Sequence, residues 1–88
     1  MRISQEKKDK ISEQILAHLF HNFPKSFFTA HIAKEIARDE EFVKKLLDEL
    51  NLNDLVTKVK KNNLGEDFLR RTKWRLSNKA HQAYKTLH

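Results

Sequence analysis

The sequence contains no cysteine, one glycine and one proline. The lack of cysteine excludes disulfide bridges, thiolate zinc sites and cysteine nucleophiles, so the fold must be stabilised by packing alone. With a single glycine and a single proline, the chain has no Gly/Ser linker, no proline-rich spacer and no low-complexity segment. A chain of 88 residues with these properties suits one domain that covers residues 1–88.

Long apolar runs are also absent. No segment approaches the roughly 18 consecutive apolar residues that a membrane span needs. The amino-terminal sequence MRISQEKK lacks the apolar stretch of a secretory signal. We therefore expect a cytoplasmic protein with no membrane partner, whose residues 1–7 form a flexible or dimerising arm.

Apolar residues recur at steps of three and four in most of the chain, which is the spacing of amphipathic helices. Pro24 ends the first of these segments, because a proline and the residue before it both disfavour helical backbone. Thr29, Asp39 and Ser77 offer side-chain oxygens for helix N-caps. The pattern predicts helices over residues 11–23, 30–37 and 39–52, and a last helix after residue 77.

After Asp54 the apolar period changes from helical to two, which predicts two strands. We predict that these strands form a hairpin with its tip at residues 62–69. Trp74 alternates with other inward positions, so we place it in the core and not against a nucleic-acid base. The shared sides are Leu55, Thr57 and Val59 in residues 55–61, and Thr72, Trp74 and Leu76 in residues 71–76.

The net charge of +6 is unevenly distributed along the chain. It is +1 for residues 1–22, +1 for 23–37, −3 for 38–55 and +7 for 56–88. Two interpretations of the basic strands remain open: a surface that binds phosphates and releases their counterions, or a solvated sheet edge that prevents aggregation. We favour the first, because few anions interrupt the run. Its cations are Lys58, Lys60, Arg71, Lys73 and Arg75 at outward positions, with Lys61 and Arg70 at the strand ends.

The third predicted helix starts with Asp39, Glu40 and Glu41. These acids favour the helix dipole but repel DNA, and one of them can accept a hydrogen bond from a cytosine amino group. Lys44 and Lys45 are the cationic contacts of this helix if it enters a groove. If this helix contacts a nucleic acid, the sequence therefore indicates binding that is weaker, or more dependent on the basic hairpin, than a fully basic helix gives.

Four segments together resemble a winged helix-turn-helix domain, as found in small bacterial and archaeal transcription regulators. They are TAHIAKEIA at residues 29–37, the apolar positions of 43–50, DLV at 54–56 and WRLS at 74–77. Glycine is common in this family where Asp54 stands, and aspartate tolerates the left-handed backbone better than most residues. The resemblance implies an α+β, mostly α fold with three helices, a two-stranded hairpin wing and a C-terminal helix.

The resemblance also implies the DNA-binding role of each part. Residues 39–52 would be the recognition helix in the major groove, and residues 62–69 the wing over the backbone. Lys34 on the preceding helix would contact phosphate, as would His31, for which we favour a plain surface role. A homodimer is expected because such domains commonly read two half-sites. Its interface candidates, which the core of the domain also claims, are Ile3, Leu16, Phe20, Tyr84 and Leu87.

No catalytic set, cofactor site or small-molecule site emerges from the sequence. His18 and His21 lie three residues apart, but no cysteine accompanies them, and we interpret both as solvated or packed side chains. The leading hypothesis is a non-enzymatic regulator of transcription that binds double-stranded DNA. The alternatives are a protein–protein adaptor, whose acidic third helix docks a basic partner, and a protein that binds structured RNA.

Overall fold

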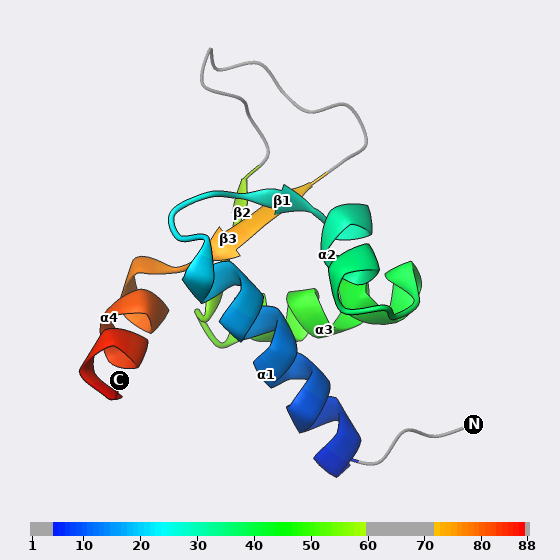
Figure 1. Ribbon diagram of the computed structural model, residues 1–88, viewed down its shortest axis with the longest axis horizontal. Helices are drawn as coiled ribbons and strands as arrows, with labels where there is room; N and C mark the ends of the chain where they lie inside the picture. Colours follow the sequence, from blue (N-terminus) through cyan, green and yellow to red (C-terminus); the bar gives the residue numbers. More distant parts are fainter. Residues whose placement is uncertain (1–4, 60–71, 88) are drawn as a thin grey trace.

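The computed structural model describes residues 5–59 and 72–87. Within them the three strands form an antiparallel sheet in the order β1-β3-β2. Figure 1 shows the sheet above α1 and α3, with α2 and α4 at opposite ends of the molecule. The elements are α1 (Gln5–His21), β1 (Phe27–Phe28), α2 (Thr29–Glu35), α3 (Glu40–Leu52), β2 (Val56–Val59), β3 (Lys73–Leu76) and α4 (Asn78–Leu87).

The short strand β1 makes the sheet three-stranded, where the sequence predicts only a two-stranded hairpin. Phe27 pairs with Trp74 and Phe28 pairs with Lys73. The predicted extended piece at residues 26–28 therefore has a partner, and it covers the edge of β3 that β2 leaves open.

One hydrophobic core joins the helices to the sheet. The helical spacing of the apolar residues is confirmed, because the predicted stripes of α1 and α3 are buried. Trp74 is 1% exposed, so its placement in the core is also confirmed. Burying a large apolar side chain contributes about 1.5–3 kcal/mol. The buried apolar set is Ile11, Ile15, Leu16, Leu19, Ile32, Ala33, Val43, Leu46, Leu47, Leu50, Val56, Trp74, Leu76 and Ala80.

The predicted caps of α3 and α4 are present. The Asp39 carboxylate accepts a hydrogen bond from the backbone N–H of Phe42 at 3.1 Å. The Ser77 hydroxyl accepts one from the N–H of Ala80 at 3.0 Å. Asp54 has a φ of 60°, so it adopts the left-handed conformation that ends the α3 segment and starts β2.

Thr29 does not cap α2, which corrects the sequence prediction. It is itself the first helical residue, and the N-cap position belongs to Phe28, which makes no side-chain cap bond. The Thr29 hydroxyl instead accepts a hydrogen bond from Nε1 of Trp74 at 2.8 Å. A buried indole N–H needs an acceptor, and the pairing of β1 with β3 brings this hydroxyl to it.

The ends of α1 also differ from the predicted range. The helix begins at Gln5, so residues 5–7 of the expected arm are helical, and it ends at His21, before Phe23. The side-chain amide of Asn22 donates a hydrogen bond to the carbonyl of His18 at 2.8 Å just beyond the last turn. In the part of the chain that the structure describes, we find no helix with the length and apolar character needed to cross a membrane.

Candidate nucleic-acid interface

Helix α3 presents two lysines on the side away from the core. Val43, Leu46 and Leu47 are buried, whereas Lys44 and Lys45 are exposed. This division follows from the helical repeat of 3.6 residues, which turns positions 43, 46 and 47 to one face. Both lysines therefore lie on accessible positions of the helix, as the sequence predicts.

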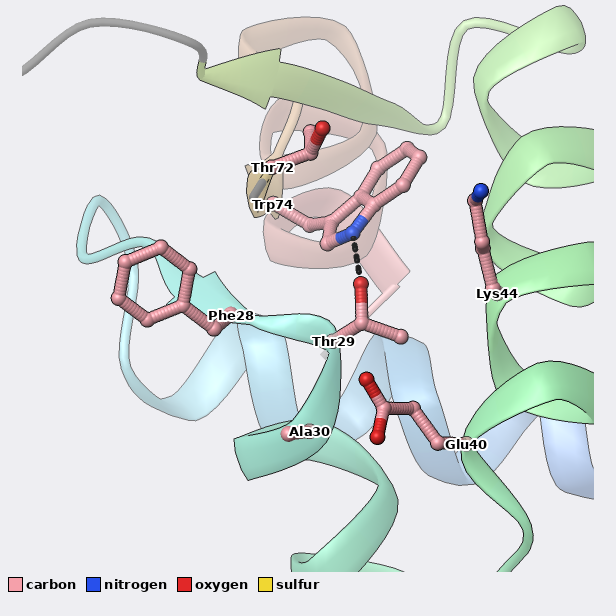
Figure 2. Close-up of a pocket in the computed structure, with 7 residues that line it drawn as sticks. All are labelled: Phe28, Thr29, Ala30, Glu40, Lys44, Thr72 and Trp74. Carbon is pink, nitrogen blue, oxygen red and sulfur yellow. Dashed lines mark hydrogen bonds between the residues drawn. The ribbon is translucent and has the colours of Figure 1, made fainter. Parts of the chain in front are cut away.

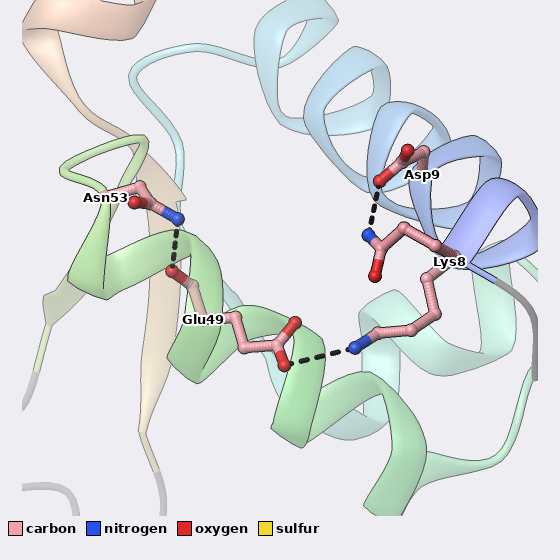
Figure 3. A network of polar contacts seen from close by, with 5 residues as sticks. Lys8, Asp9, Glu49 and Asn53 are labelled. Atoms are coloured by element: carbon pink, nitrogen blue, oxygen red, sulfur yellow. Dashed lines mark hydrogen bonds and ion pairs between the residues drawn. The ribbon is translucent and has the colours of Figure 1, made fainter.

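The acidic side chains of α3 have different surroundings at the start of the helix and farther along it. Glu40 and Glu41 are exposed in the first turn, where they complement the helix dipole. Farther along, the ammonium of Lys8 on α1 donates to Oε1 of Glu49 at 3.2 Å (Figure 3). The side-chain amide of Asn53 donates to the Glu49 carbonyl at 3.1 Å, at the end of the same helix. Glu49 therefore forms an exposed ion pair between α3 and α1, which contributes little to stability.

The register of β2 places Lys58 on the face of the sheet that carries Trp74. Directly paired residues of an antiparallel ladder project to the same face, and successive residues alternate. Lys58 therefore faces away from Lys73 and Arg75, and the prediction of one outward row containing all three is wrong. The pairs are Val56 with Leu76, Thr57 with Arg75, Lys58 with Trp74 and Val59 with Lys73.

The predicted inward side of β2 is likewise wrong. Leu55, Thr57 and Val59 are only partly buried, whereas Val56 is 1% exposed. Leu55 and Val56 are adjacent apolar residues, so the strand alone does not determine which side enters the core. Pairing with β3 decides it, because the core residue Leu76 lies opposite Val56.

Lys58 lies between the sheet and α3. Its Nζ is 5.6 Å from the centroid of the Trp74 ring and 3.6 Å from Oδ1 of Asp48 on α3. Its long aliphatic stem allows a cation on this face to reach solvent at the edge of the core. An ion pair as exposed as this one contributes little to stability, so the lysine remains available to an external anion.

Lys73 and Arg75 have different surroundings on the other face. Nζ of Lys73 is 4.9 Å from the ring centroid of Phe28. Nη1 of Arg75 donates to the carbonyl of Leu76 at 2.9 Å and to Oδ1 of Asn78 at 3.3 Å. The described cations of the strands are thus divided between two faces. Lys60, Lys61, Arg70, Arg71 and the tip at residues 62–69 lie outside the described residues.

A cavity of about 310 Å³ opens between α3 and the sheet (Figure 2). Glu40 and Lys44 enter its lining from one face of α3, one helical turn apart. Thr29 and Thr72 come from segments far apart in the sequence, so no local pattern marks them as neighbours. Lys34 is exposed on α2 and does not line this cavity. The lining residues are Phe28, Thr29, Ala30, Glu40, Lys44, Thr72 and Trp74.

A histidine cluster lies where α1 meets β1 and α2. The ring of His18 is 5.0 Å from Phe27 and 6.2 Å from His31, and Nε2 of His31 is 3.9 Å from Oε1 of Glu35. Nε2 of His18 is buried and has no hydrogen-bond partner among the described residues. Burial lowers the pKa of His18, while the carboxylate of Glu35 opposes this shift. His18 is therefore a partly buried ring whose surroundings favour the neutral form.

The described residues contain no group of three histidine, aspartate or glutamate side chains arranged to hold a metal. His18 and His21, three residues apart on α1, are therefore not part of such a group within residues 5–59 and 72–87.

Solved structures of other proteins share this arrangement. The chain matches MepR from S. aureus, in a MepR–DNA complex, with a TM-score of 0.70 at 21% identity over 93% of this chain and 67% of MepR. It matches ZitR, a zinc-responsive MarR family member from Lactococcus lactis, with a TM-score of 0.67 at 21% identity over 97% of this chain and 51% of ZitR. The chain also matches the Zα domain of Carassius auratus PKZ, in complex with Z-DNA, with a TM-score of 0.61 at 23% identity over 80% of this chain and 97% of that domain.

The chain has the winged-helix fold. In this fold α2 and α3 form the helix-turn-helix pair, and β2 and β3 form the base of the wing. The chain spans about half the length of ZitR and of MepR in a further crystal structure. No protein-family model matches the sequence, and no curated protein matches it significantly.

Proposed function

We propose that this chain binds double-stranded DNA and regulates transcription, with α3 in the major groove. The observation that carries the proposal is the outer side of α3, which exposes Lys44 and Lys45. A helix placed in this way can enter a groove while the wing lies along the backbone. MepR, a protein of similar fold, has been crystallised with DNA. The proposal includes a cytoplasmic location. It includes no catalytic activity and no cofactor.

The proposed phosphate contacts differ in their position relative to α3. Lys58 contacts a phosphate from the face of the sheet that is turned toward α3, because its ammonium lies near the Trp74 ring and the Asp48 carboxylate. We keep Lys34, Lys60, Lys61, Arg70 and Arg71 as further phosphate contacts. Lys73 and Arg75 lie on the opposite face of the sheet, so their contribution to a duplex held by α3 is smaller.

The acids of α3 limit the electrostatic part of the affinity. Glu40 and Glu41 stand at the end of the helix that approaches the DNA, where they repel phosphates. The proposed complex therefore depends on the wing and on salt concentration more than a complex with a fully basic recognition helix does.

We also propose a homodimer that pairs two half-sites. Phe20 on α1 and Tyr84 on α4 have ring centroids 5.4 Å apart and are only partly buried, so they offer an apolar surface beside the two helices. Leu16 is only 7% exposed and belongs to the core of its own chain, so we no longer propose it for the interface. Ile3 and the side chain of Leu87 lie outside the described residues.

The test is fluorescence anisotropy of a labelled DNA duplex over a salt series, with duplex RNA as competitor. We expect binding at low salt, a logarithm of affinity that falls linearly with the logarithm of salt, and preference for DNA. Replacing Lys44 and Lys45 together by alanine should weaken binding. Absence of binding at low salt, or an undiminished affinity of the double variant, contradicts the proposal. Sedimentation with and without the duplex reports the oligomeric state.

A further inference from the structure

Three of the side chains that line the cavity between α3 and the sheet can donate hydrogen bonds. Thr29, Thr72 and Lys44 line it from α2, the start of β3 and α3 (Figure 2). Its volume of about 310 Å³ corresponds to roughly ten water molecules at about 30 Å³ each, enough for one phosphodiester group with its hydration. The cavity therefore has room and donors for an oxyanion.

The indole of Trp74 orients one of these donors. Its Nε1 donates to the Thr29 hydroxyl at 2.8 Å, so the oxygen of that hydroxyl is used as an acceptor. A hydroxyl has one proton to give, and this proton remains for an acceptor in the cavity. Trp74 is 1% exposed, which holds the pair in a fixed geometry.

The charged groups at and near the cavity are balanced, with Lys44 and Glu40 in its lining and the Lys58–Asp48 pair close by, so an anion is held by Lys44 only where it lies away from Glu40. Lys44 lines the cavity directly, and Nζ of Lys58 is 5.6 Å from the Trp74 ring. Glu40 also lines the cavity, and in Figure 2 its carboxylate points toward the start of α2. Asp48 holds Lys58 at 3.6 Å across a partly exposed pair, which an entering phosphate can replace.

We infer that this cavity binds one phosphate group of the DNA backbone, with Lys44 and the hydroxyls of Thr29 and Thr72 as its ligands. The inference rests on the proposed function and adds to it the position at which the backbone is held. A phosphodiester offers only acceptor oxygens, which suits a set of two hydroxyl donors and an ammonium. Lys44 is thereby a phosphate contact, while Lys45, which does not line the cavity, is left for the groove.

Two pairs of neighbouring residues provide matched variants, because Glu40 and Lys44 line the cavity and Glu41 and Lys45 do not. Affinity for a duplex is measured by anisotropy at several salt concentrations. Lys44→Gln should weaken binding roughly tenfold and lower the salt slope by about 1. Lys45→Gln should also change the ratio between the affinities for duplexes of different base sequence, because Lys45 is left for the groove. Glu40→Gln should tighten binding more than Glu41→Gln, because only Glu40 faces the bound phosphate.

Trp74 supplies an independent signal, since it is the one tryptophan of the chain. Its fluorescence and its indole N–H resonance should change when the duplex binds. The change should persist in Lys45→Gln and be much smaller in Lys44→Gln and in Thr72→Val. Duplexes with a single methylphosphonate, which removes one backbone charge, should reproduce part of the Lys44→Gln loss at one position of each half-site, and Lys44→Gln should be insensitive to that substitution.

The outcomes separate this inference from the proposed function. If the duplex binds but the Trp74 signals stay constant, or Lys44→Gln and Lys45→Gln behave alike, the phosphate site is refuted and DNA binding stands. If the wild-type chain binds no duplex, the proposed function fails, and titration with inorganic phosphate decides the cavity alone. A shift of the Trp74 indole resonance that Lys44→Gln abolishes then supports an anion site, and no shift refutes it.

Discussion

Lys58 and Trp74 are cross-strand partners on one face of the sheet, and the lysine ammonium lies 5.6 Å from the indole ring. This pairing turns Lys58 toward α3 and separates it from Lys73, which projects from the opposite face. The cations of the wing base therefore act on two sides of the sheet. A duplex that contacts α3 meets one of these sides.

The first prediction compares Lys58→Ala with Lys73→Ala in duplex binding. The two residues carry the same charge on neighbouring strands, so each serves as the control for the other. Lys58→Ala should weaken binding more and reduce the salt slope by about 1, because it removes a proposed phosphate contact beside α3. Anisotropy over a salt series measures both quantities. Equal losses for the two variants would mean that the duplex reaches both faces of the sheet.

The second prediction concerns the bond between Trp74 and Thr29. Thr29→Val keeps the shape of the side chain but leaves the buried indole N–H without its acceptor, which should lower the free energy of unfolding by about 1–3 kcal/mol. Urea denaturation followed by far-UV circular dichroism measures this loss. Thr57→Val, at a partly buried threonine of β2, is the control and should change stability by less than about 0.5 kcal/mol. Unchanged stability of Thr29→Val would show that the indole finds another partner.

The third prediction tests the start of α3. Asp39→Ala removes the cap of the Phe42 N–H and should cost about 1 kcal/mol of unfolding free energy. Asp39→Asn keeps an acceptor oxygen and should retain most of the stability, while losing a negative charge near the proposed DNA. Chemical denaturation and duplex affinity are measured on both variants. A similar loss of stability in the two would assign the effect to the charge and not to the cap.

The fourth prediction is a pH dependence of stability from His18. Its pKa in the folded chain lies below the ordinary value of 6.5, chiefly because of burial. The unfolded chain then binds more protons, so the free energy of unfolding should be fully retained above this value and should fall as the pH drops below it. The facing groups are His21 on α1, His31 and Glu35 on α2, and Lys25 beside Phe27.

Thermal unfolding between about pH 8 and about pH 5 measures this dependence. In His18→Phe, which keeps a ring against Phe27, the melting temperature should fall less with acidification than in the wild type. His81→Phe, which keeps a ring against Phe23, removes a histidine that does not act on the pKa of His18 and is the control. If the melting temperatures of both variants fall as steeply with acidification as that of the wild type, the protonation of His18 does not cause the pH dependence of stability.

The helices could be predicted from the sequence because their signals are local. Apolar residues three and four apart mark the buried faces of α1 and α3, and the oxygens of Asp39 and Ser77 cap the helices that follow them. The left-handed turn at Asp54 was also predictable, because aspartate is among the few residues that accept this conformation. Lys44 and Lys45 are exposed as expected for the same reason, since the buried stripe of α3 determines the opposite face.

The cavity and the third strand could not be predicted from the sequence. A strand of two residues, Phe27–Phe28, has too little pattern to identify its partner. Thr29 has the local sequence features of an N-cap. Its hydroxyl instead accepts a hydrogen bond from the indole of Trp74, which is distant in the sequence. Lys60, Lys61, Arg70 and Arg71 stay predictions, because they lie outside the described residues.

Local patterns in the sequence predict the helical segments, the caps of α3 and α4, the buried tryptophan and the excess of positive charge after residue 56, because each depends on residues within a few positions of one another. The face of the sheet that Lys58, Lys73 and Arg75 occupy depends on the pairing of strands that are distant in the sequence. A strand presents two alternating faces, and a shift of one residue exchanges them. Here the contact of Val56 with Leu76 in the core selected the register, and Lys58 followed Trp74 to the side of α3.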